Sequence, residues 1–94
     1  MQKYELIVIF QADLDEAALD AAVENIETLI KSNHGVIEKI DRWGKRKLAY
    51  LIRKTNEGYY VLVNFEYDPE EVANLRRALG FNEHILRHSI VRVD

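Results

Sequence analysis

The stretch Tyr59-Tyr60-Val61-Leu62-Val63-Asn64-Phe65-Glu66-Tyr67 decides the fold. Successive side chains of a strand point to opposite faces of a sheet, so the alternation in this stretch predicts a strand with one fully apolar face. We expect that face to lie in the core, and its members are Tyr59, Val61, Val63, Phe65 and Tyr67.

Two regular segments precede this strand near the start of the chain. Residues Tyr4–Phe10 are β-branched and aromatic and predict a first strand. Apolar residues then recur at steps of three and four, which predicts an amphipathic helix with Asp13 or Asp15 as its cap and Gly35 as its stop. The buried stripe of that helix is expected to contain Leu19, Ala22, Val23, Ile26, Leu29 and Ile30.

The region that leads into the decisive strand predicts one half of a hairpin. Val36–Ile40 and Lys47–Ile52 both have strand character, and a bulge at Gly44 would join them into one long strand. Thr55–Gly58 contains Asn and Gly and predicts the turn between the two strands.

The last third of the chain predicts one more helix and one more strand. Asp68 is a capping residue followed by Pro69 at the first helical position, and Gly80 is the expected stop. Ile85–Val93 predicts the final strand. The order β-α-β-β-α-β is typical of a ferredoxin-like α+β sandwich, with a four-stranded antiparallel sheet and two helices on one face, and we expect a single domain over residues 1–94.

This topology leaves the second face of the sheet without a helical cover. The first and third strands are central in such a fold, so the alternation places Ile7 and Ile9 beside Tyr60 and Leu62 on the uncovered face. An exposed apolar strip indicates a binding partner, and we predict these four residues as a protein interface.

Composition limits the class of protein. The chain has no cysteine, 48% hydrophobic and 31% charged residues, and no apolar run long enough for a membrane span. We therefore expect a cytoplasmic globular protein without disulfides and without a membrane partner. Its net charge is −3, yet residues 5–38 hold eight acids and one base whereas residues 42–54 hold six bases and no acid. Such a local basic patch attracts a polyanion regardless of the total charge.

The basic segment combines the two chemistries that RNA binding requires. Lys and Arg side chains bind phosphates, and flat aromatic rings stack on bases or riboses. We predict Trp43, Lys45, Arg46, Lys47, Tyr50, Arg53 and Lys54 as RNA-binding residues. Two other interpretations stay open on composition alone: the charges could protect an edge strand from aggregation, and the two rings could belong to the core.

The same segment resembles a known family. Trp43-Gly44-Lys45-Arg46-Lys47-Leu48-Ala49-Tyr50, followed by Ile52, is similar to the signature of bacterial ribosomal small-subunit protein six. The opening Tyr4-Glu5, the hairpin from Asn56 to Tyr60 and the closing stretch from Phe81 to Arg87 resemble that family at matching spacings. The resemblance covers essentially the whole chain.

This resemblance implies a specific role and specific partners. Members of the family are ribosome-bound, non-catalytic proteins that pair with ribosomal small-subunit protein eighteen and join the central domain of the small-subunit ribosomal RNA. By position, Lys3, Arg87 and Arg92 are added to the predicted RNA-binding residues. The chain departs from the family in having Gln2 where an arginine is common.

Enzymatic and metal-binding functions have little support. His84 and His88 lie four residues apart in a predicted strand, which separates their side chains by about 13 Å, so we expect no metal site. Acylphosphatase, an enzyme of similar fold, uses a Gly- and Arg-containing loop after its first strand, but residues 11–16 of this chain contain three acids and neither Gly nor Arg. We expect no cofactor and no small-molecule substrate. A pure protein-interaction module is the remaining alternative.

Overall fold

The computed structural model describes residues 1–93, which form one sheet and two helices. The elements are β1 (Gln2–Gln11), α1 (Glu16–Ser32), β2 (Val36–Ile52), β3 (Thr55–Tyr67), a short 3₁₀ turn (Pro69–Glu71), α2 (Val72–Gly80) and β4 (Ile85–Arg92). The predicted β-α-β-β-α-β order is confirmed.

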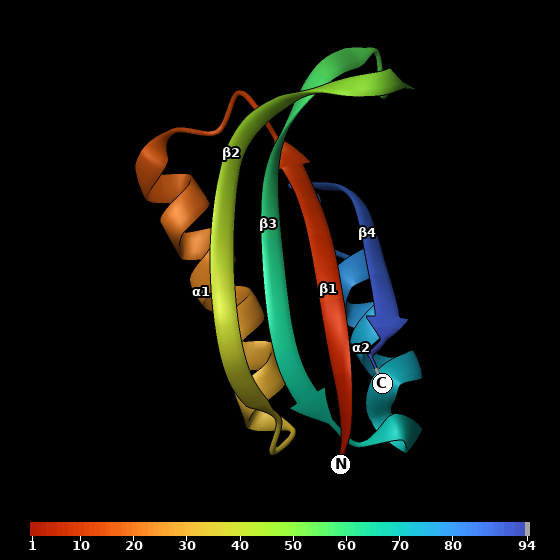
Figure 1. The fold of residues 1–94 in the computed structure, drawn as a ribbon. Coiled ribbons are helices and arrows are strands. Elements are labelled where there is room, and N and C mark those ends of the chain that lie inside the picture. The colour runs from red at the N-terminus through yellow and green to blue at the C-terminus, as the bar shows by residue number, and fades with distance from the viewer. Residues whose placement is uncertain (94) are drawn as a thin grey trace.

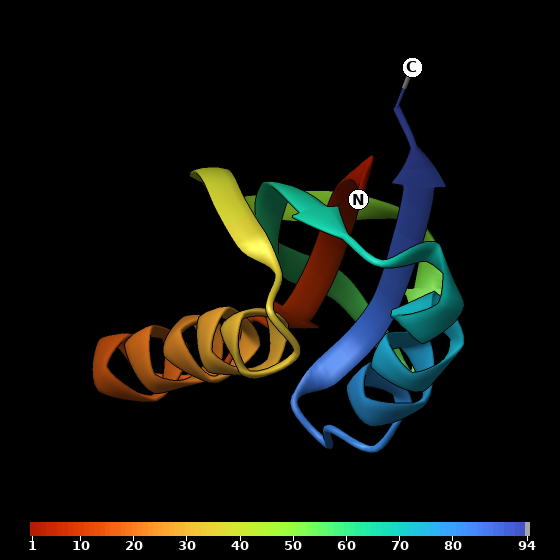
Figure 2. The same ribbon diagram turned by 90° about the horizontal axis from the view of Figure 1, so that it is seen from below.

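The sheet has the strand order β2-β3-β1-β4, and all neighbouring strands are antiparallel. Strands β1 and β3 are therefore central, as the sequence predicts. Figure 2 shows both helices on the same side of the sheet, which leaves the opposite face open. The ferredoxin-like sandwich is confirmed.

The core lies between the helices and the covered face of the sheet. The predicted set from β3 is buried there: Val61, Val63, Phe65 and Tyr67 are at most 1% exposed, and Tyr59 packs partly buried against them. From α1, five of the six predicted residues are buried and Leu29 is partly buried. Alternation in the strand and helical periodicity therefore identified the core correctly.

The first helix begins at one of its two predicted caps, whereas the second begins later than its predicted cap indicates. Asp15, and not Asp13, caps α1 by accepting a hydrogen bond from the amide of Ala18 at 2.8 Å. Asp68 accepts from the amide of Glu70 at 3.0 Å, but the chain first makes the 3₁₀ turn, and α2 begins only at Val72.

The end of α1 corrects the predicted role of Gly35. The residue with left-handed backbone is His34, with φ of 65°. Position 35 requires glycine for a different reason, because neighbouring atoms leave no room for a side chain. A Cβ atom at position 35 would lie 2.6 Å from the Ile30 Cγ2 atom and 2.7 Å from the Tyr67 ring. The glycine therefore permits close packing of the helix end against the sheet.

Strand β2 is a single bent strand, as the bulge at Gly44 predicts. Its pairing with β3 shifts register between Arg42 and Gly44, and Gly44 has φ of +87°. A left-handed residue at a bulge bends the strand and increases its twist, and glycine adopts this backbone without steric cost.

The predicted turn at Thr55–Gly58 is wrong, because these residues belong to β3. The chain instead reverses at Arg53 and Lys54, between the paired residues Ile52 and Thr55. Both turn residues have positive φ, 50° and 65°, which is the backbone of a two-residue type I′ hairpin turn. Asn and Gly favour that turn, so a turn made of Arg and Lys escapes prediction from residue preference.

Candidate nucleic-acid and protein interface

The hairpin of β2 and β3 extends beyond the rest of the sheet. The last residue of β1, Gln11, pairs with Gly58, so within residues 1–93 the part of β3 before Gly58 pairs with β2 alone. We call residues 45–57 the hairpin arm. Figure 1 shows the arm leaning across the end of β1 toward β4.

The hairpin arm carries the predicted basic residues, and they are exposed. It contains five bases and one acid, Glu57. Lys45, Arg46 and Lys47 are adjacent and exposed, and in the described residues 1–93 none of the three forms an ion pair. Three unpaired, solvent-facing cations at one end of a small protein form a strong local positive potential.

Two contacts at the far end of the arm hold it against β4 and the loop before β4. The Arg53 guanidinium Nη1 donates a hydrogen bond to the carbonyl oxygen of Glu83 at 3.1 Å. The guanidinium of Arg87 lies 5.7 Å from the centre of the Tyr50 ring, which is a cation–π distance. Two predicted RNA-binding arginines are thus engaged within the protein.

A second group of contacts lies just before the arm, at Arg42 and Trp43, which we call the arm root. The Arg42 Nη1 atom pairs with the Asp20 carboxylate of α1 at 2.5 Å, and its Nε donates to the Tyr59 hydroxyl at 3.1 Å. The hydrogen bond to Asp20, and then that to Tyr59, raise the pKa of Arg42, so its charge is permanent. Beside it, the ring of Trp43 stacks on Tyr60 with 6.3 Å between ring centres.

The open face of the sheet contains the predicted partner residues as direct neighbours. Ile7 pairs with Leu62, and Ile9 pairs with Tyr60. Ile9 departs from the expected exposed strip: it is only 9% exposed, because the arm bends back over it. A Cβ at Gly58 would lie 2.3 Å from the Ile9 Cγ2 atom, which shows how close the hairpin comes.

Trp43 and Tyr50 are surface residues, so the interpretation that places them in the core is wrong. Trp43 is 41% and Tyr50 57% exposed. Trp43 lies over Tyr60 and donates from its indole nitrogen to Asp41, so it extends the open face. Tyr50 borders a hollow of about 170 Å³ between the arm and that face; its other lining residues are Ile9, Leu48, Ala49, Ile52, Tyr60 and Arg87.

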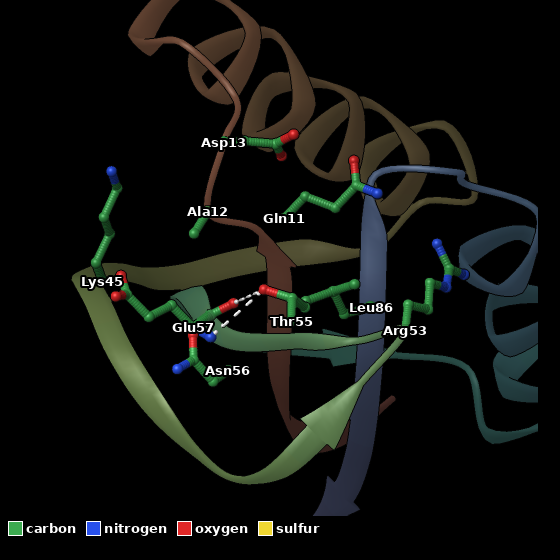
Figure 3. A pocket seen from close by; sticks show the side chains of 9 residues that line it. All are labelled: Gln11, Ala12, Asp13, Lys45, Arg53, Thr55, Asn56, Glu57 and Leu86. Carbon is green, nitrogen blue, oxygen red and sulfur yellow. Dashed lines mark hydrogen bonds between the residues drawn. The ribbon is translucent and has the colours of Figure 1, made fainter.

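A second, more polar groove of about 460 Å³ lies between the arm and the loop after β1. Figure 3 shows Lys45 and Arg53 on opposite sides of it, with Asp13 and Glu57 also along its lining. The carboxylates repel anions, so this groove differs from the phosphoryl cradle that acylphosphatase forms after its first strand.

The remaining predicted RNA-binding residues lie elsewhere. Lys3 is at the opposite end of β1, where its ammonium is 3.9 Å from the Glu38 carboxylate. Arg92 pairs with the same end of β1 and donates to the Gln2 side chain at 2.9 Å. The ten predicted residues therefore occupy the arm, the adjoining open face and the far end of the sheet, and they do not form one continuous patch.

Sequence reasoning missed the residues that hold the arm in place. The contacts of Asp20 with Arg42, and of Glu83 with Arg53, join positions 22 and 30 residues apart. No local pattern encodes these pairs. The one available signal was Gly58, an isolated glycine beside a strand, which is typical of close backbone approach.

The described fold and the charged extension define a class: a ferredoxin-like α+β protein with a basic hairpin arm and an open sheet face. In residues 1–93, no helix has the length and apolar character to cross a membrane. Comparison with known proteins gives the family. The family described as Ribosomal protein S6 matches residues 3–92.

Individual relatives agree with this match. Small ribosomal subunit protein bS6 of Clostridium perfringens is 46% identical over 94 residues, which cover 100% of this chain and 99% of the relative. The bS6 protein of Clostridium kluyveri is 47% identical over 92 residues, with 98% and 97% covered. The crystal structure of 30S ribosomal protein S6 from Thermotoga maritima superposes with a TM-score of 0.93 at 30% identity, covering 98% of this chain and 87% of that one.

This chain belongs to the ribosomal protein S6 family. It is therefore a structural protein of the small ribosomal subunit and not an enzyme.

Proposed function

We propose that the chain binds the central domain of the small-subunit ribosomal RNA through the hairpin arm, while its open sheet face binds ribosomal small-subunit protein eighteen. The observation that carries the RNA assignment is the exposed, unpaired run Lys45, Arg46 and Lys47 on an arm that projects beyond the sheet. Phosphate contacts from such a run position a protein on RNA without reading bases.

Charge and burial support the division between two surfaces. Lys54 at the turn and the Lys45–Lys47 run are exposed on the arm, whereas Tyr60 and Leu62 lie within the sheet and are half-buried. An interface core is apolar and aromatic and depleted of charge, which fits Ile7, Tyr60, Leu62 and Trp43. We therefore reassign Trp43 from the RNA surface to the protein surface.

The hollow beneath the arm lies where the two proposed surfaces adjoin. Its lining is mostly apolar, and Arg87 closes one side. A side chain of the partner protein that enters it would contact Tyr50 and Tyr60 together. The partner then binds against both the sheet and the arm, so RNA and protein binding meet at one element.

Binding to a central-domain RNA fragment in the presence of the partner protein tests the RNA assignment. Replacing Lys45, Arg46 and Lys47 with Ala removes three phosphate contacts. We expect the slope of log affinity against log salt to fall by roughly 2 to 3, with a loss of affinity on the order of a hundredfold at 0.1 M salt. Filter binding at four or more salt concentrations measures both quantities.

A matched control removes positive charge from the helical side. Lys31 and Arg77 are exposed on α1 and α2, and their double replacement with Ala should leave the salt slope unchanged. If the triple arm variant keeps the wild-type affinity and slope while it still binds the partner protein, the chain is a protein-interaction module and the RNA assignment is wrong.

A further inference from the structure

The arm begins next to a flexible residue, Gly44, and next to a group of side-chain contacts made by Arg42. We call these contacts, with Asp20 and Tyr59, the clamp. Gly44 has left-handed backbone at the register shift, and among residues 1–93 no atom other than those of its chain neighbours lies within 4 Å of the place where its Cβ would be. Nothing packs against that point to hold the bend. Contacts beside Gly44 can therefore contribute to the direction of the arm, together with the contacts of Arg53 and Tyr50 at its far end.

Arg42 makes these contacts across the bulge. It pairs with Val61 on the sheet side of the register shift, whereas Tyr59 pairs with Lys45 on the arm side. The Arg42 guanidinium bonds to the Tyr59 hydroxyl and also lies 5.4 Å from the centre of the Tyr59 ring. The Arg42 side chain thus holds Tyr59, which is the β3 partner of Lys45, the first residue of the arm.

Asp20 completes the clamp from a third element. It lies on α1 and binds the same guanidinium, so the arm root is tied to the helical layer as well as to the sheet. The Arg42 side chain is 34% exposed and its charge is matched by a carboxylate. This makes Arg42 a poor phosphate ligand, unlike the bases beyond the bulge.

We infer that Arg42, held by Asp20 and Tyr59, is a positioning residue that sets the direction in which the hairpin arm presents its bases to RNA. This inference rests on the proposed RNA-binding role of the arm. It assigns a function to Asp20, an acidic residue that a purely electrostatic account of RNA binding would count as unfavourable.

The direction in which one substitution changes the RNA affinity distinguishes a positioning role of Asp20 from a purely electrostatic one. Asp20→Asn removes a negative charge, so electrostatics alone predicts RNA binding that is unchanged or tighter. Loss of the clamp predicts binding about three- to tenfold weaker, because the arm must be ordered on binding. The salt slope should stay the same, since all phosphate-binding side chains remain.

Two further variants make the comparison specific. Glu24→Gln neutralises an exposed acid on the same helix, and within residues 1–93 Glu24 has no ion-pair partner, so its effect reports electrostatics alone. Asp20→Glu keeps the charge and should restore most of the affinity. If Asp20→Asn and Glu24→Gln give the same affinity, the inference is overturned.

Measurements without RNA keep this test independent of the proposed function. The chain has one tryptophan, Trp43, next to Arg42, so its emission reports the geometry of the arm root. In Asp20→Asn we expect a change in that emission and faster amide hydrogen exchange confined to residues 45–57. If the triple arm variant shows that the arm does not bind RNA, these two readouts still decide whether Asp20 and Arg42 position it. Unchanged emission and exchange would refute the positioning role.

Discussion

Strands β2 and β3 pass through two different environments along their length. Below Gly44 and Gly58 they form half of a four-stranded sheet, where every second residue of β3 is buried under the helices. Above those glycines the same two strands form the hairpin arm, in which Tyr50 and Leu51 are 57% and 65% exposed. Strand formation thus continues where burial stops: the body of the sheet contains the core, and the arm contains an exposed cluster of bases.

Substitutions of large apolar residues in the two parts should give the largest contrast. Phe65 is fully buried in the body of the sheet, and Phe65→Ala should lower the free energy of unfolding by about 3 to 5 kcal/mol because it leaves a cavity. Leu51→Ala in the arm should change it by no more than about 0.5 kcal/mol. Urea denaturation measures both. A large loss from Leu51→Ala would mean that the arm is part of the core.

The border between the two parts can be tested at Gly58. In Gly58→Ala the new Cβ would collide with the branched methyl of Ile9, a stiff side chain that cannot move without shifting β1 or the hairpin. We expect a loss of about 1 to 3 kcal/mol in the free energy of unfolding. Gly80→Ala at the end of α2 is the matched control, because its Cβ meets no atom within 4 Å. Equal effects of the two substitutions would argue against close contact between the hairpin and β1.

Substitutions in the turn of the arm should give the smallest change in the free energy of unfolding. Arg53 and Lys54 both adopt left-handed backbone, which is unfavourable for residues with a Cβ atom. Replacing them with Asn and Gly, the preferred pair for this turn, should raise the free energy of unfolding by about 1 kcal/mol. The RNA affinity should fall at the same time, because two positive charges are lost.

A charge-matched variant separates turn geometry from charge in this experiment. Arg53→Ala with Lys54→Ala removes the same charges but keeps the unfavourable backbone, so it should not gain stability. Thermal unfolding of the two double variants makes the comparison. If they unfold at the same temperature, the turn residues carry no backbone strain.

The difference between body and arm also explains what the sequence could predict. Burial on one face imposes a period of two on β3 and of about 3.6 on α1, and such periods are visible in a single chain. The core and the order of the elements follow from them, whereas residue type alone left the cap of α1 open between Asp13 and Asp15. The turn of the arm consists of Arg53 and Lys54, which residue preference does not mark as a turn, so it was predicted at the adjacent Thr55–Gly58 instead.

The predicted sites divide in the same way. Lys45, Arg46 and Lys47 were identified by charge, which depends only on residue type. The engagement of Arg53 with Glu83, and the burial of Ile9, depend on where the arm bends in space. That bend arises from Gly44 together with long-range contacts, and neither the angle nor the contacts are encoded in a local pattern.

The clamp at the arm root and the contacts at its far end have a consequence for the thermodynamics of assembly. Fixing the backbone of one residue costs about 1 to 2 kcal/mol in conformational entropy, so ordering the dozen or so residues of a free arm during RNA binding would cost on the order of 10 kcal/mol. Here Glu83 and Arg87 contact the arm directly, and Asp20 binds Arg42 next to it, so these contacts are already present in the folded protein. On the proposed RNA-binding role, RNA would therefore meet a preformed arm, and association should show little of the unfavourable entropy that accompanies coupled folding and binding.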